Sequence, residues 1–208
     1  DITDQLTRAD IRGELTKELE RHGATLAALR GNTAVNQSTL EATLSRLEPL
    51  LATLRSPACQ PGQRLRQMEL VTQVRQRLAI PGGLCSFDLP AFHFWLSRSD
   101  AGRVAALQDW MDDLRCIEDG VQLALQLVRE SAIPQKVAAP GGFYQQNLEP
   151  ASPCQLVRVL LNAEEDVFAE ISGGKHRFTV RFIRPAESGA RAQQTANTVH
   201  FELQCCGL

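Results

Sequence analysis

The chain has few aromatic residues and no long apolar segment. Aromatic residues make up 5% of its 208 positions, with one tyrosine and two tryptophans, which leaves few rings on which nucleic-acid bases could stack. No apolar run approaches the roughly 18 residues that a membrane-spanning helix needs, and the first residues do not have the pattern of a signal peptide. We therefore expect a cytoplasmic protein that does not insert into a membrane.

An excess of charge of one sign is also lacking. The 22 basic and 24 acidic residues give a net charge of −2, a field too weak and of the wrong sign to attract nucleic acid. With 43% hydrophobic and 22% charged residues, the composition is that of a folded globular protein and excludes a disordered chain or a collagen-like fibre. Any electrostatic function must therefore be local.

The cysteines have no spacing typical of a metal or redox site. None of the six forms a C-x-x-C pair, and two of them are adjacent in the sequence, which suits neither a zinc site nor a disulfide framework. We expect reduced thiols and no bound metal. The six are Cys59, Cys85, Cys116, Cys154, Cys205 and Cys206.

The first two thirds of the chain have a helical period. Apolar residues recur every three or four positions from residue 7 to about residue 132, the pattern of helices with one buried stripe. Thr7 with Asp10, and Ser38 with Glu41, have the spacing of capping boxes. The pattern predicts helices over residues 7–29, 38–54 and 63–79, and a brief helix that starts at Pro90 and carries Phe92, Phe94 and Trp95. One long helix or two should then extend from about residue 100 to 132.

The last third has a period of two. Strands are predicted over residues 142–145, 155–161, 167–171, 176–183 and 198–206, with a polar loop at 188–197. Phe178, Val180 and Phe182 should form the buried face of one strand. The predicted fold is α+β: a helical bundle domain (residues 1–136) followed by a mostly antiparallel β domain (residues 137–208).

The strand at 176–183 carries the main charge cluster of the β domain. Lys175, Arg177 and Arg181 share its solvent face, and Arg184 follows. These cations form either a solvated face neutralised by neighbours such as Glu202, or a strip that recognises carboxylates through the planar guanidinium groups. A nucleic-acid-binding module built on residues 175–184 is a third interpretation.

Catalytic and cofactor motifs are weak. The sequence Ser172-Gly173-Gly174-Lys175 lacks the glycine and the Ser or Thr that a phosphate-binding loop requires, so we expect no nucleotide and no other cofactor. Cys85 and His93 could pair as nucleophile and base, but no orienting residue or oxyanion motif accompanies them. We expect a protein that is not an enzyme.

Several segments together resemble the ZapD family of bacterial cell-division proteins, whose members associate with the FtsZ ring. The order and spacing of these segments across most of the chain make the resemblance specific. The segments are residues 74–83, 85–90 with His93 and Trp95, 142–145, 171–173, 175–178, 181–182, 201–203 and 205–206.

The resemblance implies a cytoplasmic homodimer without catalytic activity, located at midcell. Such a dimer binds the C-terminal tail of FtsZ and cross-links FtsZ filaments into bundles that stabilise the division ring. The tail-binding positions that the family implies here are Arg8, Arg177 and Arg181, with Lys175 and His93 as weaker additions.

Overall fold

The computed structural model describes residues 2, 5–6, 10–149, 154–186 and 191–208. Helices occupy the first part of the chain and antiparallel strands the last part, so the fold is α+β, as the two periods predicted. The chain divides into two units, Asp1–Ala124 and Leu125–Leu208. Among the described residues, no helix combines the length and apolar character needed to cross a bilayer. The domain boundary at 136/137 stays a prediction.

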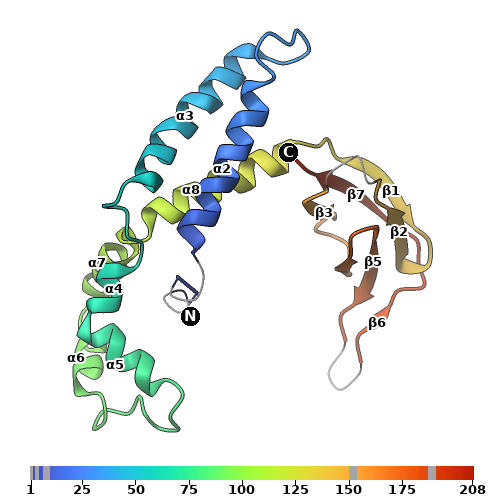
Figure 1. Cartoon of the computed structure of the whole chain (residues 1–208). Helices are drawn as coiled ribbons and strands as arrows, with labels where there is room; N and C mark the ends of the chain where they lie inside the picture. The colour runs from blue at the N-terminus through green and yellow to red at the C-terminus, as the bar shows by residue number, and fades with distance from the viewer. Residues whose placement is uncertain (1, 3–4, 7–9, 150–153, 187–190) are drawn as a thin grey trace. The chain divides into compact units, whose positions relative to one another are not determined.

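The helical unit is built on a pair of neighbouring helices, α2 (Ile11–Ala27) and α3 (Gln37–Arg55), which lie side by side in Figure 1. Each helix buries one apolar stripe. The buried residues are Leu15, Leu19 and His22 on α2, and Leu40, Leu47, Leu51 and Leu54 on α3. Gly23 permits the close approach of the two helices, because a Cβ there would lie 2.8 Å from the Leu47 side chain.

The helix starts differ from the predicted capping boxes. Asp10 alone caps α2, its carboxylate accepting from the Gly13 amide at 2.9 Å, while Thr7 lies outside the described residues. Asn36 caps α3 through the Thr39 amide, two residues before the predicted Ser38. Asn accepts a hydrogen bond from a backbone amide at this position as well as Ser does, so Asn36 was an equally good capping candidate from its residue type. Pro49 does not shorten α3, which continues to Arg55.

The single helix predicted over residues 63–79 is wrong. The chain forms α4 (Gln63–Gln67) and α5 (Glu69–Arg77), separated by an extended Met68. The Thr72 hydroxyl donates to the Arg66 carbonyl at 3.2 Å, a side-chain bond that competes with the helical backbone pattern. Leu78, near the end of the predicted helix, is exposed.

The short helix α4 depends on a residue far along the chain. Its N-terminal Gly62 has φ 72° and offers no capping side chain. Asp113 supplies the missing acceptors: its carbonyl accepts from the Gly62 amide at 3.3 Å, and its carboxylate accepts from the Leu65 amide at 3.2 Å. A carboxylate also interacts favourably with the positive end of a helix.

Three further helices follow: α6 (Pro90–Leu96), α7 (Asp100–Asp112) and α8 (Arg115–Glu130). The last stretch is thus two helices. α8 packs on the first pair through Gly120, where a Cβ would lie 2.6 Å from the Leu15 side chain. The helical period over residues 100–132 predicted one buried apolar stripe, and this is wrong for part of it: Val104, Leu107, Met111, Val121 and Leu125 are exposed.

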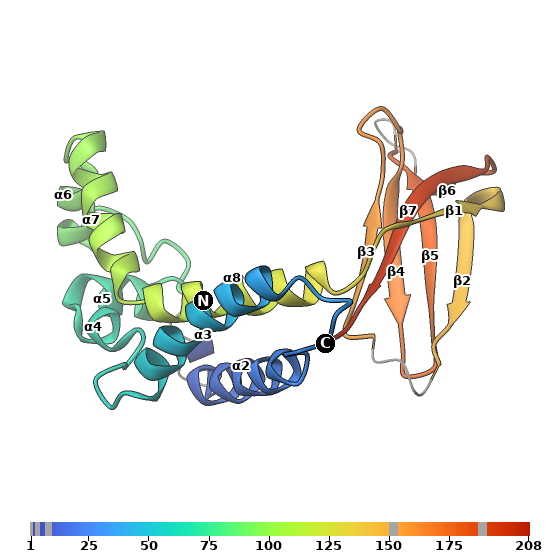
Figure 2. The ribbon, with the colours of Figure 1, turned by 90° about the horizontal axis from the view of Figure 1, so that it is seen from above.

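The β unit consists of two antiparallel sheets (Figure 2). The first, sheet A, has the order β1-β7-β3, and the second, sheet B, has β2-β5-β4 with β6 also paired to β5. The strands are β1 (Gln135–Ala139), β2 (Phe143–Asn147), β3 (Leu156–Leu160), β4 (Phe168–Gly173), β5 (Arg177–Arg184), β6 (Gln193–Gln194) and β7 (Val199–Cys206), with the 3-10 helix η1 (Pro140–Gly142) between β1 and β2.

The core of the β unit lies between the two sheets. Phe178, Val180 and Phe182 of β5 are fully buried, as the alternation predicted, and pack with Phe201 of β7. The ring centroids of Phe182 and Phe201 are 4.9 Å apart. Aromatic pairs at such distances stabilise a core beyond their buried area.

Two strands were not predicted. β1 has a Gln-Lys-Val-Ala-Ala sequence with one β-branched residue, and its pairing with β7 makes it a strand. β6 lies inside the segment 188–197 that the sequence marked as a loop. In both cases tertiary pairing decides the outcome over local propensity.

Candidate functional site

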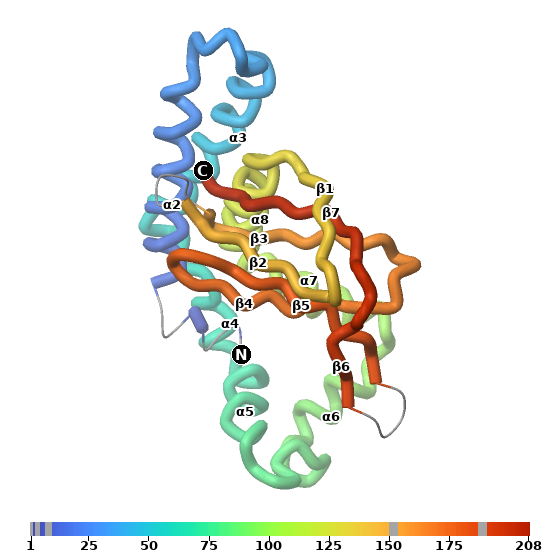
Figure 3. The backbone as a smooth tube through the Cα atoms, turned by 90° about the vertical axis from the view of Figure 1, so that its right-hand side faces the viewer, coloured from blue at the N-terminus to red at the C-terminus, as the bar shows by residue number. Residues whose placement is uncertain are grey.

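The outer face of sheet B brings two of the predicted binding residues together. β5 is the central strand of this sheet, with β4 alongside it in Figure 3. Arg177 and Arg181 are exposed and alternate with the buried Phe178, Val180 and Phe182. Side chains two residues apart on a strand share one face, so both guanidinium groups belong to the solvent face, as predicted.

Arg181 is held in position by a polar chain. Its Nε donates to Oε1 of Gln194 at 3.1 Å, and Nε2 of Gln194 donates to the Gly141 carbonyl at 2.7 Å. Among the residues that the structure describes, the terminal nitrogens of Arg181 have no acceptor. The side chain is therefore oriented by one nitrogen while the other two are available to a ligand.

Arg177 and Lys175 lie at the end of the β4–β5 hairpin. A hollow of about 590 Å³ extends over residues 172–179 and includes both of them with Gly173, Gly174 and His176. Lys175 belongs to the turn and not to β5. Within the described part of the chain, neither Lys175 nor Arg177 forms an ion pair.

The acidic neighbour of this surface differs from the one that the sequence suggested. Glu202, the proposed neutralising residue, is on β7 in sheet A, directly opposite Lys136 of β1. Glu170 of β4 is opposite Arg181. Three cations thus share the hairpin and outer face with one carboxylate on the neighbouring strand, and the balance remains positive.

Two exposed aromatic side chains join the basic residues, and sequence reasoning missed both. Phe143 of β2 is opposite Arg181, and Phe168 of β4 is opposite Ile183. Directly opposed residues in antiparallel strands share a face, and these two rings remain 42% and 43% exposed. The signal in the sequence was a phenylalanine at the start of each strand, but it could be used only once the pairing register was known.

Of the two remaining predicted residues, only His93 is among the described residues. His93 is on α6 in the helical unit, where its Nε2 is 2.9 Å from the Leu84 carbonyl oxygen and its ring contacts Phe92 edge-on. Its visible role is to hold the loop before α6. Arg8 lies outside the described residues.

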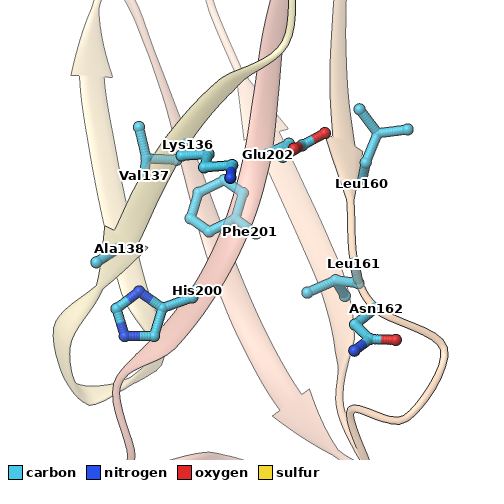
Figure 4. A pocket seen from close by; sticks show the side chains of 9 residues that line it. All are labelled: Lys136, Val137, Ala138, Leu160, Leu161, Asn162, His200, Phe201 and Glu202. Atoms are coloured by element: carbon cyan, nitrogen blue, oxygen red, sulfur yellow. The ribbon is translucent and has the colours of Figure 1, made fainter.

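A second hollow, of about 500 Å³, lies on the outer face of sheet A. Figure 4 shows Lys136 of β1 and His200 and Glu202 of β7 around it, with Leu160 and Asn162 on the opposite side. One cation and one carboxylate balance each other there. This hollow therefore lacks the positive charge that distinguishes the outer face of sheet B.

The chemistry available at the sheet B face is that of binding. Guanidinium groups donate paired hydrogen bonds to carboxylates, and the exposed phenylalanine rings can pack against apolar side chains. No group of three or more His, Cys, Asp or Glu side chains arranged to hold a metal occurs within the described ranges. The arrangement suits an acidic peptide with apolar residues.

Comparison with known proteins identifies the family. The family model described as "ZapD: Cell division protein" matches residues 1–181. The chain belongs to the ZapD family. It is 41% identical over 206 residues to the cell division protein ZapD of Methylococcus capsulatus, covering 99% of this chain and 80% of that protein.

Other relatives carry the same name. The cell division protein ZapD of Dechloromonas aromatica is 35% identical over 208 residues, covering 100% of this chain and 82% of the relative. That of Coxiella burnetii is 34% identical over 202 residues, covering 97% and 78%. This ZapD family member is therefore a cell-division factor. The family match extends through Lys175, Arg177 and Arg181, the basic residues of the sheet B face.

Proposed function

We propose that this ZapD family member binds the acidic C-terminal tail of FtsZ on the outer face of sheet B, and acts at midcell by binding and not by catalysis. The observation that carries the proposal is the pair Arg177 and Arg181 on one exposed strand face. Phe143 and Phe168 beside them supply contacts for apolar side chains of the tail. Lys175 adds positive charge at the hairpin end.

The expected affinity of one site is low. Each exposed ion pair contributes about 0 to 1 kcal/mol and is screened by salt. A tail that is unfolded when free also loses conformational entropy on binding. Two sites on one dimer compensate, because a filament offers many tails and the second contact forms at high effective concentration. Cross-linking and bundling of FtsZ filaments would follow from this bivalency.

A fluorescent FtsZ tail peptide titrated with the intact protein tests the binding site. The double variant Arg177→Glu, Arg181→Glu should lower the affinity by about 10- to 100-fold, since two ion pairs of up to about 1 kcal/mol each are lost and repulsion is added. A higher salt concentration should also lower the affinity of the unaltered protein for the peptide.

A matched control changes the charge by the same amount elsewhere. Lys17→Glu with Lys136→Glu reverses two exposed lysines, one on α2 and one on β1. This control should bind the peptide with little change. An equal loss of peptide affinity in both variants would show a nonspecific charge effect. Unchanged binding by the arginine variant would show that the site does not lie on β5.

We propose that the second copy needed for bivalency covers the exposed face of α7 and the start of α8. Val104 and Met111 are 52% and 46% exposed there, and with Leu107 they line a hollow of about 500 Å³. The paired Asp112 and Arg115 border it. In a two-fold dimer the same surface faces itself, so Asp112 of one copy can lie opposite Arg115 of the other.

Sedimentation velocity tests this assignment. Leu107→Glu with Met111→Glu should convert the dimer to monomer, because charges replace buried apolar contacts at an interface. Ile133→Glu is the control, since this residue is also apolar and exposed but lies outside α7. A dimer that persists in the α7 variant would place the interface elsewhere.

A further inference from the structure

Two cysteines that are far apart in the sequence meet in the helical unit. The Sγ atoms of Cys59 and Cys116 are 3.0 Å apart, although 57 positions separate the residues. Cys59 belongs to the segment between α3 and α4, and Cys116 is the second residue of α8. Both are free thiols. A disulfide bond is about 2.05 Å long, so the two sulfurs need to approach by only about 1 Å.

The backbone around the two thiols is held by other contacts. Nη1 of Arg12 on α2 donates to the Cys59 carbonyl at 2.6 Å. Asp113, three residues before Cys116, accepts from the amides of Gly62 and Leu65. The segments that carry the sulfurs are therefore held in place without any bond between them. The conformational entropy of bringing residues 59 and 116 together is already lost when the protein folds.

The surroundings permit access but slow the reaction. A hollow of about 560 Å³ has both cysteines in its wall, with Ser56, Arg64 and Asp112. Burial, followed by the neighbouring Cys59 thiol, raises the pKa of the Cys116 thiol to about 12. The reactive thiolate is consequently scarce at neutral pH. A small neutral oxidant can reach the pair, but it should react slowly.

We propose that Cys59 and Cys116 form a reversible dithiol–disulfide modification site for hydrogen peroxide. One thiolate attacks the peroxide O–O bond, giving a sulfenic acid and hydroxide, which takes up the proton that the thiol lost and leaves as water. The second thiolate attacks the sulfenic sulfur, forms the S–S bond and displaces hydroxide, which is again protonated to water. Two thiols and one peroxide thus give one disulfide and two waters, and a dithiol reductant reverses the oxidation.

The bond would tie the segment after α3 to the start of α8. A cross-link that closes a loop of this length reduces the freedom of the unfolded chain. The melting temperature of the helical unit should therefore rise by roughly 5–15 °C on oxidation. Bond formation should also become faster with rising pH, as the thiolate fraction increases.

Peptide mapping of the oxidised full-length chain tests the proposal. The protein is incubated with hydrogen peroxide at pH 8.5, remaining thiols are alkylated in denaturant, and the chain is cleaved with trypsin. The cysteines of interest fall in separate peptides, residues 56–64 and 116–129, and Cys85 falls in residues 78–98. We expect the peptides 56–64 and 116–129 to be joined by a disulfide bond that dithiothreitol breaks. This bond should form more slowly at pH 7 than at pH 8.5.

Variants separate this pair from general oxidation. Cys59→Ser and Cys116→Ser should each abolish the cross-link and the rise in melting temperature, whereas Cys85→Ser should preserve both. Recovery of both cysteines as alkylated thiols would overturn the proposal. It would equally be overturned if Cys59 or Cys116 were linked mainly to another cysteine, or to a second chain. The mapping uses the unaltered protein, so its outcome does not depend on whether the variants fold.

Discussion

Neighbouring residues on β5 should differ sharply in what they contribute to stability. Phe182 has 0% exposure and packs against Phe201, whereas Arg181 is exposed and its Nε donates to Gln194. Phe182→Ala removes a buried ring and should cost about 3–5 kcal/mol. Arg181→Ala removes one exposed hydrogen bond and should cost less than about 1 kcal/mol.

The difference of at least about 2 kcal/mol corresponds to roughly a 30-fold or larger change in the opening equilibrium of the sheet. Hydrogen–deuterium exchange of peptides from β5 and β7 measures that opening. The two tryptophans, Trp95 and Trp110, are on α6 and α7. Their fluorescence during urea denaturation therefore reports on the helical unit and serves as a separate signal.

If Arg181→Ala loosened β5 as much as Phe182→Ala, the arginine would be on the buried face. A shift of one residue in strand pairing moves every side chain to the opposite face. The binding face proposed for sheet B would then be wrong as well.

Two further predictions concern a turn and a titrating side chain. Gly142→Ala should destabilise the β unit by more than Gly141→Ala, since both glycines have positive φ but only at Gly142 would a Cβ lie 2.6 Å from the Thr195 carbonyl oxygen; equal melting temperatures would contradict this. Burial lowers the pKa of His22 from 6.5, so the unfolded chain binds the proton more readily and stability should fall as pH drops below about 6.5. His22→Leu should flatten this dependence between pH 7 and 5, measured by urea midpoints, and an unchanged slope would assign it to other groups. The hydrogen bond with Arg21 lowers the pKa of Glu18 to about 2. The stability that ionised Glu18 contributes is therefore lost only below pH 4.5.

The sequence predicted the β unit where one face is buried and the other is solvated. In β5 and β7 the apolar and polar residues alternate, and burial follows that alternation over residues 177–182 and 199–203. It departs from it towards the end of each strand, where Ile183, Gln204 and Cys206 are buried as well. β1 could not be predicted because its short, alanine-rich sequence becomes a strand by pairing with β7. Periodicity describes a segment, whereas pairing depends on a partner elsewhere in the chain.

The same limit explains the errors in the helical unit and at the candidate site. An apolar stripe shows which side of a helix avoids water but not what covers it, so Val104 and Met111 were expected to be buried within the unit. The shared face of Arg177 and Arg181 followed from a period of two. The phenylalanine beside Arg181 depends on the β2–β5 register, and the meeting of Cys59 with Cys116 depends on three-dimensional packing.

The support that Asp113 gives to α4 has a consequence for the order of folding. A helix of five residues is too short to be stable by itself, and the acceptor for its Leu65 amide is a residue 48 positions further along the chain. During synthesis, α4 should therefore stay unformed until the junction of α7 and α8 has left the ribosome. Within the helical unit, α4 should then become ordered later than its place in the sequence suggests, after helices that follow it have been synthesised.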